Sequence, residues 1–568
     1  MAATVRRTSA SLRSRLEALP ALRRLAGGDE PETGVVLAQG LVASVMIVVG
    51  SWGVGWLASS QLSIFARTVF LNPLRVEPAG VIACTLLLAF GSMLLCRSWL
   101  RLGQRGGWGP AAMPTVRRAV LLWGAPLLLS FPIFSRDVYS YIGQGRLLHA
   151  GLSPYENWIS QLPGWFAEGS DSLWAESPSP YGPLFLLGAQ AVYFFTGGVP
   201  EAGVLLFRLF AAAGVLLCLK VLPQLAARLG SEPAWALWIS VANPLFLLNM
   251  VAGVHNDAVM LGVLLWAFLL VFRGRRLAGV LAASVAIAIK PIVVLALPFL
   301  GLAMLPRDAG LGRRIRAWTF TAVVAGGALA FFGWASGLWF GWIKAMATAG
   351  SAAFPYAPVG LLGLAVGWIG SLAGGDLNDI AEVVYALFKV AAIGLTAWLA
   401  LRRPADPPVL ACAYALTAAV VLAPIIQPWY LLWLAPLFAA SRVYDGAWVR
   451  SWYILTLVLV LVGVVDQLSV AQWIDLTVVR LIAAAVGLAY LAYIVFVDPR
   501  TATMFGSGRF AARFRKRFTR RAAGQGDDPE NPGPRTPEPV TPAPNGANPK
   551  TPNPKTPNPR NKRNRTPA

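Results

Sequence analysis

The chain has 568 residues, of which 56% are hydrophobic and only 13% are charged, and its mean hydropathy is +0.60. Soluble domains carry roughly 25% charged residues, so this composition excludes a water-soluble globule. The 22 Trp and 27 Phe, set within long apolar runs, exclude a disordered chain as well. The sequence therefore predicts a polytopic membrane protein.

The net charge of +22 is not spread evenly along the chain. The tail from Arg500 to Ala568 holds 15 Lys and Arg against 4 Asp and Glu, which is half of the excess. The remaining cations cluster in short loops between apolar runs, as expected when positive loops stay in the cytoplasm. The charge therefore does not indicate a nucleic-acid partner.

Apolar runs define the predicted helices in chain order. The polar, Arg-rich residues 1–34 predict a cytoplasmic N-terminal segment. The following membrane domain, 35–498, is predicted to be an all-α helix bundle with about 14 spans, within a range of about 12–15. We place the spans at 35–58, 79–96, 119–134, 203–222, 234–253, 257–272, 277–289, 291–305, 317–336, 380–401, 408–424, 428–441, 450–466 and 479–497.

Two apolar stretches, 182–197 and 357–373, are predicted to be interfacial or re-entrant, because a full crossing there would move Arg-rich loops to the outside. The loop 135–201 is then extracytoplasmic, and 39 of the 48 Lys and Arg lie inside. The nine others are Arg67, Arg75, Arg136, Arg146, Arg208, Lys290, Lys344, Lys389 and Arg480.

Lys290 lies in an apolar stretch that is too long for one untilted crossing. Pro291 disfavours a helix that continues through Lys290, so two short helices are predicted to meet there. The resulting hairpin would hold a cation just below the extracytoplasmic surface.

Two segments follow the last span. Residues 499–521 alternate Arg or Lys with Phe and predict juxtamembrane contact with anionic lipids. Residues 522–568 contain 13 of the 42 prolines and the repeat KTPNPKTPNPR, which predicts a disordered cytoplasmic tail.

The richest polar constellation directly follows the third predicted span. In SRDVYSYIGQGRLLHAGLSPYENW, residues 135–158, Asp137, Tyr141, Gln144 and Leu148 recur at helical spacing and predict an amphipathic helix at the outer membrane surface. Asp137 can be read as an ordinary N-cap. Ser135 can equally be the cap, which leaves the carboxylate of Asp137 free.

This loop and the YGPL motif that begins at Tyr181 resemble the membrane-embedded glycosyltransferases of the C-type fold, which use lipid-phosphate sugars. SRDVYSYIGQGRLLHAGLSPYE is most similar to the polyprenyl-phosphomannose-dependent α-(1→6)-mannopyranosyltransferases of lipomannan synthesis, the B-type more than the A-type. The resemblance covers roughly residues 35–498 and implies that Asp137 is the catalytic base. The loop has a single Asp where some relatives have paired acids, so neither a metal nor another cofactor is implied.

Other polar residues are expected on the same side as Asp137. His255, Asn256 and Asp257 form either a polar turn or a binding site for sugar hydroxyls, and two histidines of unknown separation do not define a metal site. Lys290 is either a snorkelling lysine or the partner of the donor phosphate.

The segment Pro424–Trp433 and the start of the fourth span supply further candidates. Gln427, Trp429 and Tyr430 either line a sugar or prenyl site or belong to an interfacial aromatic belt. Arg208 either binds phosphate or pairs with Glu201. With Asp137 as base, the candidate substrate- and donor-binding residues are Arg136, Tyr141, Gln144, Tyr181, Arg208, His255, Asn256, Asp257, Lys290, Gln427, Trp429 and Tyr430.

The resemblance implies a multi-pass plasma-membrane enzyme with cytoplasmic termini and an extracytoplasmic active site. Its expected partners are a polyprenyl-phosphate-linked mannose donor, a lipid-anchored mannan acceptor and membrane lipids. One carboxylate suffices because polyprenyl phosphate is already a good leaving group, and direct displacement then inverts the anomeric centre. Two alternatives remain: another polyprenyl-phosphate-sugar transferase, such as an arabinofuranosyltransferase, and a lipid-linked sugar flippase. A flippase is expected to show repeated halves, which this sequence lacks.

Overall fold

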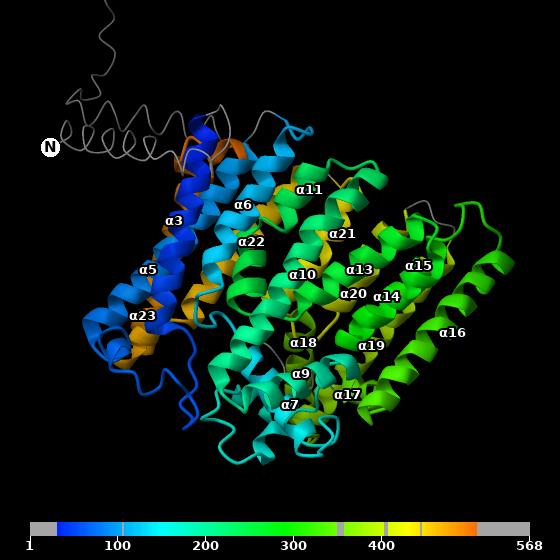
Figure 1. The fold of residues 1–568 in the computed structure, drawn as a ribbon, viewed down its shortest axis with the longest axis horizontal. Coiled ribbons are helices and arrows are strands. Elements are labelled where there is room, and N and C mark those ends of the chain that lie inside the picture. Colours follow the sequence, from blue (N-terminus) through cyan, green and yellow to red (C-terminus); the bar gives the residue numbers. More distant parts are fainter. Residues whose placement is uncertain (1–30, 105–106, 349–356, 403–406, 444–445, 508–568) are drawn as a thin grey trace, which may run out of the picture. The chain divides into compact units, whose positions relative to one another are not determined.

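The computed structural model describes residues 31–104, 107–348, 357–402, 407–443 and 446–507, and within them every secondary-structure element is helical. The predictions for most of the N-terminal segment 1–34, for the basic segment 499–521 beyond residue 507, and for the tail 522–568 fall outside this part of the chain. Figure 1 shows the arrangement of the helices.

Seven helices in the described part are long and apolar enough to cross a bilayer. They are α3 (Pro31–Val54), α5 (Pro78–Gly103), α10 (Pro200–Arg228), α16 (Leu311–Ser336), α19 (Leu377–Leu401), α22 (Gly446–Asp466) and α23 (Leu476–Ala492), which continues into η7 (Tyr493–Val497). An eighth crossing is possible if the bent pair α11 (Pro233–Ser240) and α12–η3 (Pro244–Leu247 and Leu248–Ala252), which turns by 59°, forms one span. The chain is therefore a helical membrane protein.

Shorter helices fill the remaining predicted apolar ranges. They are α6 (Ala112–Leu127), α9 (Pro183–Thr196), α13 (Asp257–Phe272), α14 (Arg276–Ile289), η4 (Pro291–Ala296), α15 (Leu297–Leu302), α18 (Pro358–Ser371), α20 (Pro408–Val421), η5 (Pro428–Trp433) and α21 (Leu434–Ala440). Every predicted span thus overlaps a helix, while the count of 14 crossings stays a prediction. The 14-residue helices α9 and α18 are about 21 Å long, which is shorter than a bilayer core.

Small helices connect these elements. They are η1 (Val69–Leu71), α4 (Asn72–Arg75), α7 (Asp137–His149), η2 (Ile159–Gln161), α8 (Ser172–Ala175), α17 (Gly341–Thr348), η6 (Ser469–Gln472) and η8 (Ala502–Phe505). Many helices begin on a proline, among them α5, α9, α10, η4 and α20. A proline at the first helical position lacks the N–H that would otherwise stay unpaired, which matters most in lipid.

The core of the bundle relies on large aromatic side chains whose polar atoms are paired. Trp99 of α5 and Trp238 of α11 stack with ring centroids 5.2 Å apart. Each indole N–H donates to the main-chain carbonyl of the other residue at 2.9 Å. This reciprocal pair ties two distant segments together without leaving a polar group unsatisfied in the apolar interior.

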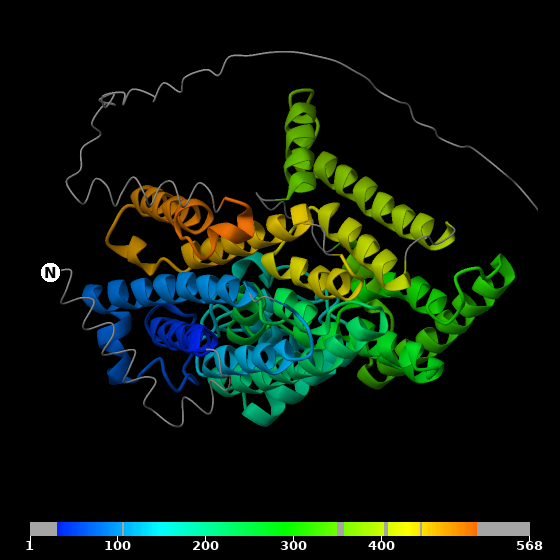
Figure 2. The same ribbon diagram turned by 90° about the horizontal axis from the view of Figure 1, so that it is seen from above.

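Helices α18 and α19 project to one side of the described bundle, as Figure 2 shows in yellow-green, while α19 packs against α20. They pack on each other through a small cluster of Val359, Ala381 and Tyr385. The outer face of α18 exposes Leu361, Trp368 and Ile369. Such a face is typical of contact with lipid.

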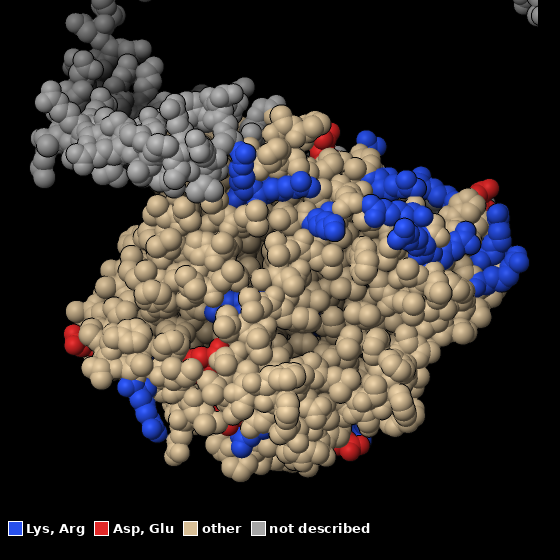
Figure 3. Space-filling model, viewed as in Figure 1, with Lys and Arg blue, Asp and Glu red and all other residues tan. Residues whose placement is uncertain are grey.

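Basic side chains gather along one edge of the molecule, at the top of the view in Figure 3. Exposed arginines in this region come from the α13–α14 connection and from α16, including Arg273, Arg275, Arg276, Arg313 and Arg316. The helices α7, α9 and α17 lie at the opposite end of the bundle (Figure 1). Residues predicted to lie on opposite sides of a membrane therefore lie at opposite ends of the fold.

Candidate functional site

The predicted loop helix is α7, and Asp137 is its first residue. The hydroxyl oxygen of Ser135 accepts a hydrogen bond of 3.0 Å from the backbone N–H of Asp137. The N-cap residue of α7 is Arg136, which makes no side-chain capping hydrogen bond. Neither Asp137 nor Ser135 is therefore the cap that the sequence suggested, and Asp137 lies in the first turn of the helix. The preceding residue, Phe134, has φ of 66°, a conformation that is uncommon outside glycine, and its ring packs against Gly463 of α22.

The structure buries α7 more completely than an amphipathic surface helix. Most residues from Asp137 to Leu147 are buried, because α9, α10 and η2 pack around the helix. Gly145 permits the contact with α9, since a Cβ there would lie 2.2 Å from the carbonyl oxygen of Ala189. The helix is therefore enclosed by the bundle and does not lie at the outer surface, where the sequence predicted it. Asp137 lies among these packed helices.

A chain of charged and polar side chains extends from Asp137 into the bundle. The Nδ1 atom of His255 lies 3.7 Å from Oδ2 of Asp137 and 3.9 Å from Oδ2 of Asp257. Asp257, the first residue of α13, accepts hydrogen bonds of 2.6 Å from both Lys290 Nζ and Trp433 Nε1. Residues far apart in the sequence thus form one cluster.

Lys290 takes its position from the break that the sequence predicts. Helix α14 ends at Ile289 and η4 begins at Pro291, with Lys290 in an extended conformation between them. Its ammonium lies 5.7 Å from the ring centre of Tyr181, 5.4 Å from that of Tyr430 and 5.1 Å from that of Trp433. An aromatic cage therefore surrounds a cation that is already paired with Asp257.

The YGPL motif brings Tyr181 against this break. The N–H of Gly182 donates to the carbonyl of Ile289 at 3.1 Å. A Cβ at Gly182 would lie 2.3 Å from the carbonyl oxygen of Ala288, so only glycine permits this approach. The motif thus joins the loop that carries Asp137 to the helix pair that carries Lys290.

Several buried polar atoms next to Asp137 have no hydrogen-bond partner within the described part of the chain. They are both ring nitrogens of His255, both side-chain amide atoms of Asn256 and Oδ2 of Asp257. His255 stacks on Trp429 with the ring centres 4.0 Å apart, which fixes the plane of its ring. Buried polar atoms are normally paired, so this group is typical of a site that water or substrate hydroxyls complete.

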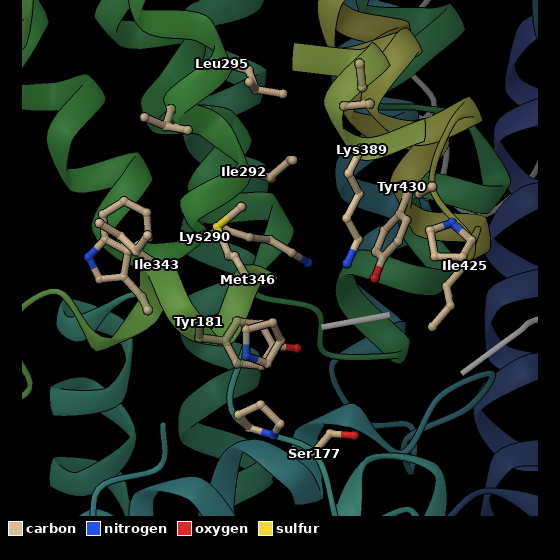
Figure 4. Close-up of a pocket in the computed structure, with 18 of the residues that line it drawn as sticks. Ser177, Tyr181, Lys290, Ile292, Leu295, Ile343, Met346, Lys389, Ile425 and Tyr430 are labelled. Carbon is tan, nitrogen blue, oxygen red and sulfur yellow. The ribbon is translucent and has the colours of Figure 1, made fainter. Parts of the chain in front are cut away.

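A cavity of about 620 Å³ opens beside this cluster, within the size range of ligand sites. Figure 4 shows labelled residues of its wall, with Tyr181 and Ser177 toward one end and Ile292 and Leu295 toward the other. The polar part of the wall comprises Asp137, Ser140, Gln144, Ser177, Tyr181, Lys290, Lys389, Trp429 and Tyr430. The apolar part includes Ile292, Val294, Leu295, Ile343, Met346, Val390, Ile393 and Leu422.

The candidate residues from the sequence, apart from two arginines, divide into three groups. Asp137, Gln144, Tyr181, Lys290, Trp429 and Tyr430 line the cavity. His255 and Asp257 lie directly behind Asp137 and Lys290, and Tyr141 packs edge-on against Tyr181 with ring centres 5.2 Å apart. Asn256 and Gln427 are buried neighbours of these residues in sequence and do not belong to the lining that the described residues form.

Two candidate arginines are engaged elsewhere. Arg136 donates to the carbonyl of Gly169 and stacks over Trp56 and Phe166. Its guanidinium therefore anchors the segment between η2 and α8.

Arg208 donates to the backbone carbonyls of Leu128, Val251 and Ala252 at 3.1–3.4 Å. Glu201, its possible partner from the sequence, instead accepts from the hydroxyl of Ser63 and the N–H of Ile64. Arg208 thus donates hydrogen bonds to carbonyls at the ends of two helical segments, where lipid provides no other donor.

The sequence analysis did not assign Trp174, Trp342, Lys389 or Trp433 to the site. The first three line the cavity, and Trp433 binds Asp257. A usable signal existed for Lys389, a lone cation in the middle of an apolar helix, because such residues are costly in lipid and are usually functional. The tryptophans gave no such signal, since membrane proteins also place tryptophan at interfaces.

Burial controls the electrostatics of Asp137. Loss of solvent raises the pKa of its carboxyl to about 7, Lys290 opposes the rise, and the charge of Asp257 adds to it. A carboxylate with this pKa can hold or release a proton near neutral pH, as a general base must. In the described part of the chain, no group of three or more His, Cys, Asp and Glu side chains has the geometry of a metal site.

Comparison with known proteins identifies the class. Residues 37–306 match the model of the alpha-(1→6)-mannopyranosyltransferase N-terminal domain, and residues 359–496 match that of the MptB C-terminal domain. The chain belongs to the alpha-(1→6)-mannopyranosyltransferase family, and it is a membrane-embedded hexosyltransferase. No solved structure matches the chain significantly.

Curated relatives extend over most of the chain. Alpha-(1→6)-mannopyranosyltransferase A of Mycobacterium tuberculosis is 31% identical over 71% of this chain and 80% of its own length. A second alpha-(1→6)-mannopyranosyltransferase of that organism is 31% identical over 77% of this chain and 84% of its own length. Alpha-(1→6)-mannopyranosyltransferase B of Corynebacterium glutamicum is 26% identical, over 70% and 73%. These values do not separate an A-type from a B-type enzyme.

Proposed function

We propose that this protein transfers mannose from polyprenyl-phosphomannose to a hydroxyl of a lipid-anchored mannan, forming the α-1,6 links of lipomannan with inversion. The observation that carries the proposal is a cavity that joins a carboxylate of raised pKa, two lysines and an apolar lobe. These are the groups that a hydroxyl nucleophile, a phosphate and an isoprenoid chain each require. The names of the relatives, all alpha-(1→6)-mannopyranosyltransferases, support the sugar and the linkage.

In this mechanism Asp137 removes the acceptor proton. The acceptor oxygen forms a bond to the anomeric carbon while the bond from that carbon to the phosphate oxygen breaks. The electron pair of the broken bond leaves with polyprenyl phosphate, and the proton stays on the carboxyl group of Asp137. Displacement from the opposite face converts a β-linked donor into an α-linked mannoside.

The neighbours of Asp137 keep its carboxylate reactive. Asp257 raises the pKa of Asp137, while Lys290 lowers it and is itself held by Asp257. His255 lies between the two carboxylates, with its ring plane fixed by Trp429. This arrangement positions the carboxylate, and a hydrogen bond with the side chain of Ser135 offsets part of the rise in its pKa.

We place the reaction on the extracytoplasmic side of the plasma membrane, with cytoplasmic termini and a C-type glycosyltransferase fold. The concentration of exposed arginines at the end of the bundle opposite α7 supports this orientation. A reporter-fusion map tests it: fusions after Asp137 and after Arg275 are expected to report opposite compartments. The orientation is wrong if both report the same one.

Purified protein, labelled donors and product-linkage analysis test the reaction. Wild-type protein is expected to give α-1,6-mannoside from polyprenyl-phosphomannose and no product from polyprenyl-phosphoarabinose. Asp137→Asn should remain folded and bind donor while losing about 10²–10⁴-fold in rate. Asp475→Asn is the matched control, because Asp475 caps α23, is exposed and does not line the cavity.

Three outcomes would contradict the proposal. Transfer of arabinose in place of mannose would assign a different sugar. Flipping of the donor without a glycosidic product would make the protein a transporter. Substantial activity of Asp137→Asn would remove Asp137 from the role of base.

A further inference from the structure

The charge of Lys290 is already balanced. Its ammonium lies 2.6 Å from Oδ1 of Asp257, which is completely buried, and three aromatic rings enclose it. An anion that approached Lys290 would meet a neutral ion pair and a neighbouring carboxylate, Asp137. Stabilisation of a lipid phosphate in this cavity therefore calls for another cation.

Lys389 supplies a second cation on the opposite wall. It projects from α19 beside Tyr430, across the cavity from Lys290, as Figure 4 shows. Ala386, Lys389, Val390 and Ile393 recur at helical spacing and all line the cavity, so one face of α19 forms this wall. Lys389 is thus directed into the cavity by the register of its helix.

A snorkelling role does not account for this position. Lys389 is near the middle of the 25-residue helix α19, and about 18 Å of helix separates it from either end. That distance exceeds the reach of a lysine side chain. Charged side chains at such a depth usually face a cavity or a partner, and Lys389 lines the cavity.

The cavity continues from Lys389 into an apolar lobe that opens outward. Val390 and Ile393 of α19 and Ile343 of α17 line it and are nevertheless 66%, 61% and 54% exposed. Ile292 and Leu295 of η4 form the facing wall. An open apolar groove next to a half-buried ammonium matches the chemistry of a long isoprenoid chain that ends in a phosphate.

We propose that Lys389 binds the phosphate of the lipid donor and that the isoprenoid chain of the donor lies between α19, η4 and α17. Lys290 stays paired with Asp257, next to Asp137. This assignment rests on the proposed function. Lys389 forms no covalent bond in the reaction. It balances the negative charge that the phosphate oxygen gains when the bond to the anomeric carbon breaks. Tyr430 lies beside Lys389 in the wall of the cavity.

Substitutions of Lys389 test the assignment through binding and kinetics. Lys389→Met is expected to weaken equilibrium binding of polyprenyl phosphate roughly 10–100-fold, the range for a lost hydrogen bond between charged groups. The KM for the donor should rise by a similar factor, while the KM for the acceptor stays unchanged. Lys389→Arg should restore much of the binding, because it keeps the charge.

Lys220→Met is the matched control. Lys220 is exposed on α10 and does not line the cavity, so its removal takes the same charge from another membrane helix. Donor binding should not change. If Lys389→Met does not fold, Lys389→Gln gives the same readouts with a polar side chain.

Two results would overturn the inference. If the variants Lys389→Met and Lys389→Gln bind polyprenyl phosphate as tightly as wild type, Lys389 does not hold the phosphate. Equal competition by inorganic phosphate and by polyprenyl phosphate would show a site for free phosphate, without a role for the apolar lobe.

The two proposals fail in different ways. Wild-type protein that binds polyprenyl phosphate through Lys389 but transfers no mannose would refute the proposed function alone. Wild-type protein that transfers mannose while Lys389→Met keeps its donor KM would refute the role of Lys389 alone.

Discussion

The substitution Asp257→Asn separates the electrostatic role of Asp257 from its shape. Asparagine keeps an oxygen that can accept from Lys290 and Trp433, as Asp257 does at 2.6 Å, but it removes the negative charge. The charge of Asp257 raises the pKa of Asp137, which lies at about 7. Its removal should therefore lower that pKa, and Lys290, freed of its counter-charge, should lower it further.

The size of the change follows from the geometry. One nitrogen of His255 lies 3.7 Å from an oxygen of Asp137 and 3.9 Å from an oxygen of Asp257, so these oxygens are at most about 7.6 Å apart. Two unit charges at that separation interact with roughly 2 kcal/mol at an effective dielectric constant of about 20. A change of about 1.4 kcal/mol corresponds to one pH unit, so the expected shift is about one to two pH units.

The assay is the pH dependence of kcat/KM for the acceptor. A base must be ionised to act, so wild-type activity should rise with pH through about 7, and Asp257→Asn should rise between about pH 5 and 6. Asp171→Asn is the graded control, because the charge of Asp171 raises the pKa of Asp137 less than the charge of Asp257 does. Its acid limb should move in the same direction by less.

The reasoning fails if Asp257→Asn, shown to be folded by its melting temperature in detergent, keeps the wild-type acid limb. It also fails if the limb moves to higher pH. In either case the group that titrates is not Asp137, or Asp257 does not act on it through charge.

Two further substitutions test the frame around the site. Gly145→Ala should leave a folded protein with reduced kcat, because the added Cβ would lie 2.2 Å from the carbonyl oxygen of Ala189 and push α7 away from α9. Gly188→Ala, with no atom within 4 Å of its Cβ, should behave as wild type. Equal activity of both variants would contradict the close contact between α7 and α9. Arg208→Met should lower the free energy of unfolding by about 3 kcal/mol or more, because several buried carbonyls lose a charged donor. Arg316→Met should have little effect, because Arg316 is exposed. Similar melting temperatures for the two variants would show that Arg208 does not have this structural role.

Much of the helical framework follows from the sequence because lipid imposes simple rules. A run of apolar residues must form helix to pair its backbone groups, and all the predicted ranges overlap helices. The break at Lys290 was also predictable, since Pro291 cannot continue the helix. Hydropathy does not fix the number of crossings, because short helices such as α13 and α14 have the composition of spans without the length.

The candidate site was predictable only in part. Asp137, Lys290 and Tyr181 were identified because each has a local signal: an acid after a span, a cation in an apolar run and a glycine-proline turn. Their convergence depends on packing between distant segments, which no local pattern encodes. For the same reason the sequence could not show that Arg208 serves backbone carbonyls.

The wall of the cavity is shared between two stretches of chain that match separate family models. Asp137, Tyr181 and Lys290 come from residues 37–306, whereas Lys389 and Tyr430 come from residues 359–496. A fragment with only the first stretch would keep the acid and lose the side of the cleft that faces it. Under the proposed mechanism, chimaeras that exchange the second stretch between relatives are expected to alter the choice of lipid carrier and to keep Asp137, the proposed base.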